Sequence, residues 1–319
     1  MKIRTSLFLA ISVLFIFFSC SIDKLAIKMV SDALGGSGDS TVFTGDNDPQ
    51  LVGDALPFAL KLYETLLSKS PDHTGLLLTT GSGFIMYANA FIQTPADMLS
   101  IGEFEKQREM WSRSKSLYLR GRDYVLRAIE LRHPGVRELL DKNKIQEAMK
   151  PMTAEDVACL YWAAAGWIAA ISIDIFDIKL TLEISKAKAL MDRAYELNPD
   201  YGNGAIHSFY ISFYASMPPD MGGSVEKARY HFKEAVRLSN GLDASPYVAL
   251  AATVAKSSEN VTEFQELLHK ALSIDPDKNP ETRLVNIINQ RKARWYLEHI
   301  NDIFLLEVED YSKTGEVDQ

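Results

Sequence analysis

The stretch SKAKALMDRAYELNP, residues 185–199, decides the fold of this chain. It places a small, a large apolar and another small residue at steps of four and three, Ala187, Met191 and Ala194, and it ends at Pro199. These steps put the three side chains on one face of an α-helix. Proline cannot continue a helix. The stretch therefore predicts an amphipathic helix with a narrow contact face and a fixed end.

The same spacing recurs along the chain, as in the second helix of a tetratricopeptide repeat. The other copies are Ala59, Tyr63, Leu66, Pro71; Gly121, Val125, Ala128, His133-Pro134, slipped by one residue; Ala228, Phe232, Ala235, Asn240; and Phe264, Leu268, Ala271, Pro276. The first helix of each repeat should carry one large residue followed by small residues three and four positions later. Two segments do so, Trp162, Ala165, Gly166 and Val248, Ala251, Ala252. A helical hairpin leaves one apolar face uncovered, and stacking the next hairpin buries it.

These patterns predict an all-α fold, because strand-like alternation is nowhere sustained. We expect a tetratricopeptide-like helical-repeat array of about four to five helix pairs. The predicted domain spans residues 49–306 and closes with a capping helix at about residues 280–304, which has one polar face. Residues 307–319 are acidic, and we expect them to be a disordered tail.

The N-terminus predicts export and a lipid anchor. Lys2 and Arg4 precede an apolar run over residues 7–18, which Ser19 and Cys20 follow. The run is too short to cross a bilayer, for which roughly 20 residues are needed, and its layout is typical of a secretory signal. A small residue before cysteine resembles the lipobox of bacterial lipoproteins, although Phe17 stands where leucine is usual. We predict a signal peptide over residues 1–19 and a lipidated tether over 20–48; ordinary cleavage and release is the alternative.

Composition limits the possible functions. The net charge of −8 argues against a nucleic-acid partner. If Cys20 carries lipid, Cys159 is the remaining thiol, and its apolar neighbours indicate a buried structural cysteine. The six histidines, at 73, 133, 207, 231, 269 and 299, have no metal-ligand spacing. Zinc, nucleophile-elbow and phosphate-loop motifs are missing. We expect no metal, no cofactor and no catalytic residue.

Two apolar segments supply candidate walls for a ligand pocket. Residues 158–176 are the most apolar part of the mature chain, and they carry Tyr161, Trp162 and Trp167 among small residues. Such a helix is covered on every side or lines a cavity. We take these three residues, with Tyr118 from the neighbouring repeat, as candidate wall residues. Packing in the core is the alternative for each, and Asp174 and Asp177 at the segment's end are read as solvated residues rather than a catalytic pair.

The second segment pairs one histidine with aromatic residues. His207 lies three and seven residues before Tyr210 and Tyr214, so that a helix would align them as an aromatic stripe with a polar head. We add these three residues to the candidate ligand-binding set. The alternative is a core face with a satisfied histidine.

Several longer motifs carry a resemblance to a known family. They are the runs 40–46 (STVFTGD), 54–61 (DALPFALK), 80–84 (TGSGF), 87–91 (YANAF), 160–162 (LYW), 219–223 (PDMGG), 279–284 (NPETRL) and 291–295 (RKARW). Together they resemble the T component of tetratricopeptide-repeat-associated TRAP transporters, over about residues 30–304. The resemblance implies a periplasmic lipoprotein that forms a homotrimer and pairs with a TRAP-type substrate-binding protein. It also implies a pocket or pore for a small apolar or carboxylate-bearing ligand.

Two other classes of function remain open from the sequence. A structural envelope scaffold would bind proteins without binding a small molecule. A hydrolase or transferase acting on lipid-like molecules would need a buried set of serine, histidine or aspartate side chains within hydrogen-bond reach. The membrane that carries the lipid on Cys20, outer or inner, is not fixed by the sequence.

Overall fold

A computed structural model of the chain describes residues 41–305, and every regular element in that range is a helix. The predicted all-α class is therefore confirmed for the described residues. Cys20, the predicted signal peptide and the predicted tail 307–319 lie outside them. The described chain forms two compact units, the first made of residues 50–96 and 101–197 and the second of residues 41–49, 97–100 and 198–305.

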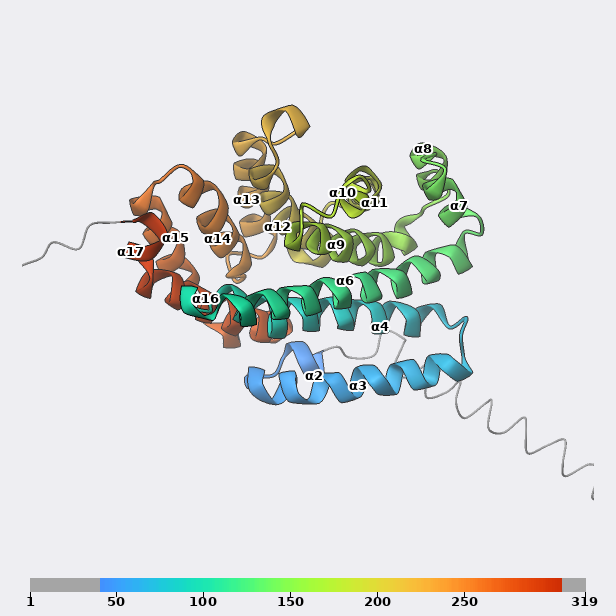
Figure 1. The fold of residues 1–319 in the computed structure, drawn as a ribbon, viewed down its shortest axis with the longest axis horizontal. Coiled ribbons are helices and arrows are strands. Elements are labelled where there is room, and N and C mark those ends of the chain that lie inside the picture. The colour runs from blue at the N-terminus through green and yellow to red at the C-terminus, as the bar shows by residue number, and fades with distance from the viewer. Residues whose placement is uncertain (1–40, 306–319) are drawn as a thin grey trace, which may run out of the picture. The chain divides into compact units, whose positions relative to one another are not determined.

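Unit 1 is a succession of helices that pack in chain order, α4 against α6, α6 against α9 and α9 against α11 (Figure 1). Its elements are α3 (Pro49–Lys69), α4 (Thr74–Tyr87), the π-helix η1 (Ala88–Gln93), α5 (Thr94–Asp97), the 3-10 helix η2 (Ile101–Glu103), α6 (Phe104–Arg132), α7 (Val136–Asp141), α8 (Ile145–Met149), the 3-10 helix η3 (Ala154–Asp156), α9 (Val157–Ile173), α10 (Ile178–Thr181) and α11 (Ile184–Leu197).

Glycines bring the three central helices of unit 1 together. A Cβ atom on Gly81 of α4 would stand 2.6 Å from the carbonyl oxygen of Gly121 on α6, and one on Gly121 would stand 2.6 Å from the carbonyl oxygen of Gly81. On α9, a Cβ on Gly166 would meet Ile85 at 2.7 Å. Gly83, two residues after Gly81, serves close approach to α3 in the same way, because a Cβ atom there would stand 2.8 Å from Leu60 Cδ2.

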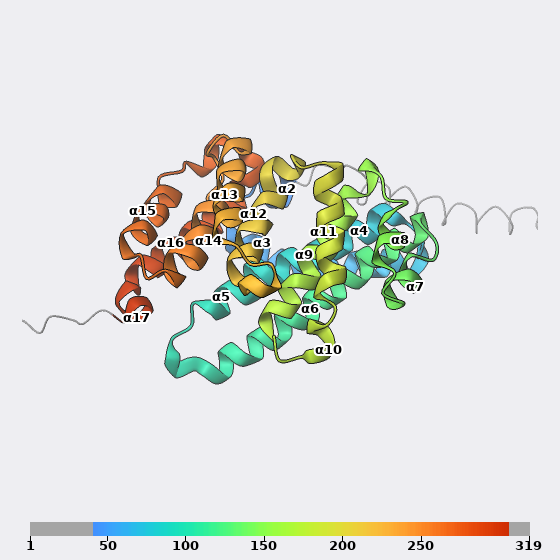
Figure 2. The same cartoon turned by 90° about the horizontal axis from the view of Figure 1, so that it is seen from above.

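Unit 2 continues the same principle with α12 against α13, α14 against α15 and α15 against α16 (Figure 2). Its elements are α2 (Thr41–Thr44), α12 (Tyr201–Ser216), the 3-10 helix η4 (Pro219–Met221), α13 (Val225–Leu238), α14 (Ser245–Leu250), the π-helix η5 (Ala251–Ala255), α15 (Val261–Leu272), the 3-10 helices η6 (Pro276–Lys278) and η7 (Pro280–Thr282), α16 (Arg283–Glu298) and α17 (Ile300–Phe304). The first described residues belong to this unit, because Arg283 donates a hydrogen bond of 2.8 Å to the Gly45 carbonyl.

The predicted helix ends are confirmed in every copy of the repeated spacing. The helices α3, α6, α11, α13 and α15 end at Lys69, Arg132, Leu197, Leu238 and Leu272, each shortly before its predicted terminator. Asn240, which stands in the proline position, has a φ of 51°. Asparagine tolerates this left-handed conformation better than most residues, so it ends α13 without a proline.

The contact faces agree with prediction in most copies and differ in the first. Ala187, Met191 and Ala194 are all buried, as predicted. On α3, however, Ala59, Tyr63 and Leu66 are only half-buried, whereas the core face carries Val52, Leu56, Leu60 and Leu67. Leu60 decides which face of α3 is buried, because it packs directly against α4. A Cβ atom added to Gly83 of α4 would stand only 2.8 Å from the Leu60 Cδ2 atom. The assignment of Ala59, Tyr63 and Leu66 as the buried face was therefore wrong.

The predicted capping helix is also divided. It starts at Arg283, after η7, and breaks at His299 between α16 and α17. The His299 ring nitrogen Nδ1 lies 2.9 Å from the Trp295 carbonyl oxygen, and its ring stacks on Trp295 at 4.4 Å. A side chain that bonds a helix carbonyl competes with the backbone ladder. Pairs of packed helices occur in both units, such as α4 with α6 and α12 with α13. Their tetratricopeptide-like arrangement stays a prediction.

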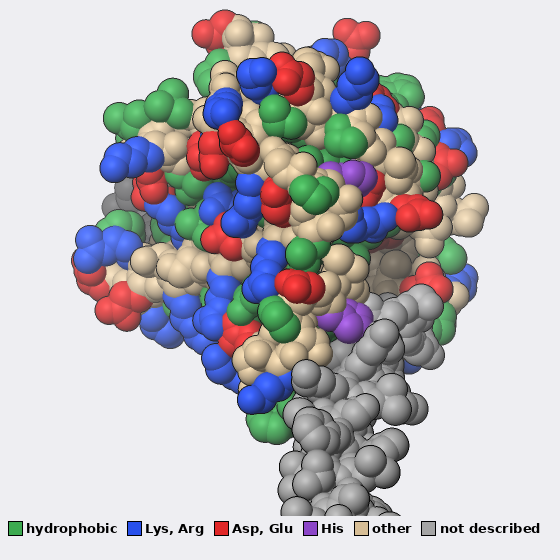
Figure 3. Space-filling view, turned by 90° about the vertical axis from the view of Figure 1, so that its right-hand side faces the viewer, with side chains coloured by type: hydrophobic (Ala, Val, Ile, Leu, Met, Phe, Trp, Pro, Cys, Tyr) green, Lys and Arg blue, Asp and Glu red, His purple; other side chains and the backbone are tan. Residues whose placement is uncertain are grey.

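Two segments of the described chain are long and apolar enough to cross a membrane, Thr74–Asp97 and Ala154–Ile173. Half of the most apolar window of the first and 56% of that of the second are buried within the protein. The core helices of a water-soluble protein have the same length and composition. On the face that carries α7 and α8, acidic and basic side chains lie among one another over the upper part of the view, and basic side chains gather at its lower left (Figure 3).

Candidate functional site

The candidate wall residues of unit 1 stand on α6 and α9 and differ in exposure. Tyr161 and Trp162 are half-buried, with ring centroids 5.2 Å apart in an edge-to-face arrangement. Ala165, Ile168 and Ala169 are half-buried as well. These positions follow one another at helical spacing, so α9 carries an apolar stripe that the rest of the protein covers only in part.

Tyr118 is fully buried on α6 and has polar partners. Its hydroxyl donates to the Gln93 side-chain oxygen at 2.6 Å and accepts from the Asn89 amide at 3.2 Å. Both partners come from η1, where the chain adopts a π-helix. Such one-turn widenings occur mostly inside α-helices and often at functional sites. The predicted ring therefore brings a hydrogen-bonded polar group into the core.

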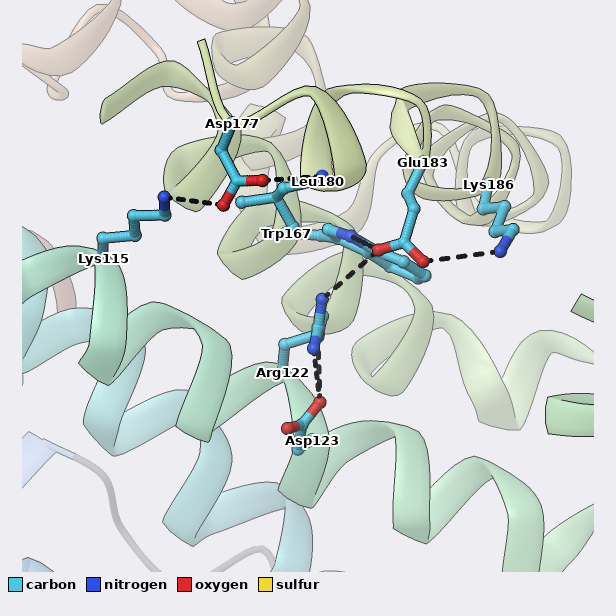
Figure 4. A network of polar contacts seen from close by, with 8 residues as sticks. All are labelled: Lys115, Arg122, Asp123, Trp167, Asp177, Leu180, Glu183 and Lys186. Atoms are coloured by element: carbon cyan, nitrogen blue, oxygen red, sulfur yellow. Dashed lines mark hydrogen bonds and ion pairs between the residues drawn. The ribbon is translucent and has the colours of Figure 1, made fainter. Parts of the chain in front are cut away.

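Trp167 is buried in a network of charged side chains rather than standing free beside a cavity (Figure 4). Its indole nitrogen donates to Glu183 at 3.3 Å, and the Arg122 guanidinium lies 4.8 Å from the ring centroid. Glu183 is also approached by Lys186 at 3.5 Å and by Arg122 at 3.9 Å. These contacts hold the Trp167 indole of α9 between Arg122 of α6 and Glu183, which directly precedes α11, in agreement with the core-packing alternative.

The second candidate cluster lies in unit 2, between α12 and α13. His207 and His231 are both buried, and their Nδ1 atoms are 2.9 Å apart. The His231 ring stacks on Tyr210 at 4.8 Å and on Tyr214 at 5.5 Å. Two neutral imidazoles can share this contact only if one donates its N–H and the other accepts. His207 is thus a core histidine with a partner, and the aromatic stripe is closed by a second imidazole.

Electrostatics keep this histidine pair neutral. Burial lowers the pKa of His207. Burial, and after it the neighbouring His207 ring, lowers the pKa of His231 to about 4. Next to His207, the Ser208 hydroxyl is buried and has no hydrogen-bond partner among the described residues.

The sequence did not single out His231, although a signal was present. His231 lies three residues after Ala228 and four before Ala235, on the contact face of a predicted repeat helix. A histidine at such a position faces the preceding helix.

A pocket of about 410 Å³ opens on unit 1, and none of the predicted wall residues lines it. Its lining is Arg120, Asp123, Tyr124, Arg127 and Arg137, from α6 and α7. Two of its arginines are engaged in ion pairs, Arg120 with Glu64 and Arg127 with Asp72. Tyr124 donates to the same Glu64 at 2.8 Å. Its volume lies within the usual range for small-molecule sites, but its lining is mostly charged.

The remaining polar candidates have structural roles. Cys159 is buried, as predicted, and burial raises the pKa of its thiol to about 11. Asp174 and Asp177 are not independent solvated residues, because Lys115 Nζ lies 2.9 Å from a carboxylate oxygen of each. Hydrogen bonding to Lys115 lowers the pKa of both carboxyl groups. Lys115 is about 60 residues away in the sequence, and no local pattern points to it.

The seven candidate wall residues therefore fall into two groups. Tyr118, Tyr161, Trp162 and Trp167 belong to unit 1, and His207, Tyr210 and Tyr214 belong to unit 2. In unit 2 the three side chains are joined through His231, whereas in unit 1 Tyr161 and Trp162 are in ring contact and Tyr118 and Trp167 have other partners. Among the described residues, no group of three or more histidine, cysteine or acidic side chains is placed to hold a metal ion. The role of the seven candidate wall residues in ligand binding stays a prediction.

Similarity to known proteins extends over nearly the whole chain. A family model described as TRAP transporter T-component matches residues 45–304. An uncharacterized protein of Treponema pallidum (strain Nichols) is 36% identical over 301 residues, which cover 90% of this chain and 93% of that protein. The family match includes both units and almost every described residue, so it applies to the fold as a whole.

Proposed function

This chain belongs to the TRAP transporter T-component family, and we propose that it is a lipid-anchored accessory subunit that binds a TRAP-type substrate-binding protein in the periplasm. The observation that carries the proposal is the family match over residues 45–304. The family is a component of a transporter and not an enzyme family. A transporter component acts at the cell envelope, which is where a protein with the N-terminus of this chain would be exported.

The proposed anchor is an acylated Cys20. The support is the sequence alone, with basic Lys2 and Arg4, a short apolar run and a small residue directly before the cysteine. Two or three acyl chains hold a protein far more firmly than the single chain that binds only marginally. The subunit would thus stay at the envelope while its partner diffuses.

We further propose that the half-buried stripe of α9 forms part of an apolar site for a small hydrophobic or carboxylate-bearing ligand. Tyr161 and Trp162 are the residues of this stripe with the largest apolar surface, and aromatic rings contribute most of the contact area in such sites. The Tyr118 hydroxyl, which is buried and bonded to Gln93 and Asn89, would act on such a site only by fixing the helices around it. The homotrimer implied by the family resemblance stays a prediction.

Binding of the partner protein can be tested directly. The full-length protein, extracted in detergent, would be immobilised and offered the TRAP-type binding protein encoded next to its own gene, with an unrelated periplasmic binding protein as control. Retention of the first and not of the second supports the proposal. Failure to retain a folded cognate binding protein, with and without its ligand, would contradict it.

The ligand site needs a separate measurement. Fatty acids and aromatic carboxylates would be screened for a rise in the melting temperature of the protein, and hits would be repeated with Trp162→Ala and with Trp295→Ala, a half-buried tryptophan on α16. The shift should be lost in the first variant and kept in the second. Retention of the partner without any ligand shift would favour the alternative, a structural envelope scaffold that binds protein only.

A further inference from the structure

The segment between α9 and α11 exposes an unusual number of large apolar side chains. The exposed fractions are 61% for Ile175, 87% for Phe176, 71% for Ile178 and 75% for Leu182. We call residues 174–182 the apolar loop. Single exposed apolar residues are common, but several gathered in one short segment mark a surface that another phase or molecule covers.

The apolar loop is held in one shape by polar contacts at its base (Figure 4). Lys115 of α6 binds Asp174 and Asp177 at 2.9 Å each, and Asp177 accepts from the Leu180 amide at 3.2 Å. The Thr181 hydroxyl donates to the Ile175 carbonyl at 3.0 Å. Leu180 alone among the large apolar residues of the loop is buried. Leu180 therefore anchors the loop in the core, while its other large apolar side chains stay exposed to solvent.

The charges around the exposed side chains cancel. Asp174 and Asp177 are paired with Lys115, and the exposed Lys179 adds a second positive charge. Without Lys115 the loop would carry one unbalanced negative charge beside Phe176, because Lys179 offsets only one of the two carboxylates. Such a loop would be repelled by the negative surface that anionic lipids give a membrane. The neutralised loop meets no such barrier.

We propose that the apolar loop inserts into the surface of the lipid bilayer that holds the acylated Cys20, so that unit 1 is docked on the membrane at a second point. This inference rests on the lipid anchor of the proposed function. The 20 residues from 21 to 40 lie between Cys20 and the first described residue. At about 3.3–3.6 Å for each extended residue they span at most about 70 Å. The tether therefore keeps the described protein within reach of the bilayer.

The form of the loop favours a lipid partner over a protein partner. Exposed fractions of 61–87% mean that the side chains stand clear of their neighbours instead of forming a flat face. A fluid bilayer surrounds protruding side chains, whereas a protein partner must offer a matching cavity of high complementarity. Apolar residues with a lysine beside them are typical of segments that lie in the membrane interface.

The test uses a fluorescent reporter in the full-length, lipidated protein. Phe176→Trp would be reconstituted into vesicles of phosphatidylcholine and phosphatidylglycerol, with and without brominated phosphatidylcholine. The matched control is Phe58→Trp on α3, because Phe58 is 76% exposed and belongs to the same unit. The chain's four tryptophans give the same background in both variants. We expect a blue shift and quenching by brominated lipid for the tryptophan at 176 and neither for that at 58.

A second variant and three controls, which are circular dichroism, flotation with the vesicles and a concentration series without vesicles, separate the outcomes. Adding Ile178→Asp to Phe176→Trp should abolish the quenching, while circular dichroism shows that the fold is kept. Protein that floats with the vesicles but shows no quenching at 176 overturns the docking and leaves the anchor intact. Protein that does not float refutes the anchor, and the docking falls with it. A blue shift that depends on protein concentration without vesicles means that a second copy covers the loop, which also overturns the proposal.

Discussion

The histidine pair of unit 2 makes the stability of the protein depend on pH in a defined direction. The pKa of His231 is about 4 in the folded protein, and an ordinary histidine in the unfolded chain has a pKa of about 6.5. The unfolded state therefore binds the proton more readily between these two values. The contribution of the buried neutral ring is complete above about pH 6.5 and is lost as the pH falls towards 4.

The magnitude follows from the two pKa values. One histidine changes the free energy of unfolding by about 1.4 kcal/mol for each pH unit inside the window, so that His231 should account for about 2 kcal/mol between pH 7 and pH 5. The pKa of His207 is lowered in the same direction. The charged groups around the pair are Glu234 and Asp200, which favour the protonated form, and Arg237 and Lys227, which oppose it.

The assay is urea unfolding of protein that begins at residue 21, followed by circular dichroism at pH 7, 6 and 5. His231→Gln is the comparison, because it removes the titrating group and keeps a polar side chain of similar length. Carboxyl groups titrate alike in both proteins, so the difference in unfolding free energy isolates the histidine. We expect wild type to lose about 2 kcal/mol more than the variant between pH 7 and pH 5. A difference that stays constant with pH would refute the buried neutral pair.

Three further perturbations test other parts of the structure. Gly121→Ala would push a methyl group towards the Gly81 carbonyl 2.6 Å away, and it should cost about 1–2 kcal/mol after a helix-propensity gain of about 1 kcal/mol, as measured by urea unfolding. Gly102→Ala is the control, because a Cβ atom there meets nothing within 4 Å, and it should leave the free energy of unfolding unchanged. Equal losses of stability in the two variants would disprove the close approach of α4 and α6. Lys115→Met should speed amide exchange in the apolar loop, and unchanged exchange there would show that the ion pairs do not hold it. The Cys159 thiol, with its pKa near 11, should resist a disulfide reagent at pH 8 until urea unfolds the protein, and rapid reaction without urea would contradict its burial.

The sequence predicted helix type and helix ends well, because both are local properties. Five terminators, among them Pro199 and Asn240, were read from residue types, and in the structure a helix ends shortly before each of them. The register of α3 was read wrongly, because several faces of that helix carry apolar residues. Only the contact of Leu60 with α4 decides which face is buried.

The candidate site could be predicted only in part. The apolar character of α9 and the aromatic stripe of α12 follow from spacing, and so did their choice as candidate walls. The side chains that form hydrogen bonds and ion pairs with these residues come from distant segments of the sequence. His231 reaches His207 across 24 residues, and Lys115 reaches Asp174 across 59. Spacing along one helix carries no information on such contacts.

The sequence by itself determined that the chain is helical, where its helices end and which family it belongs to, since periodicity, proline and family motifs are written in neighbouring residues. Tertiary structure alone decided which histidine is paired, which carboxylates are neutralised and which apolar side chains stay outside, Phe176 above all. These outcomes depend on burial and on distances between helices, and both exist only once the helices have packed.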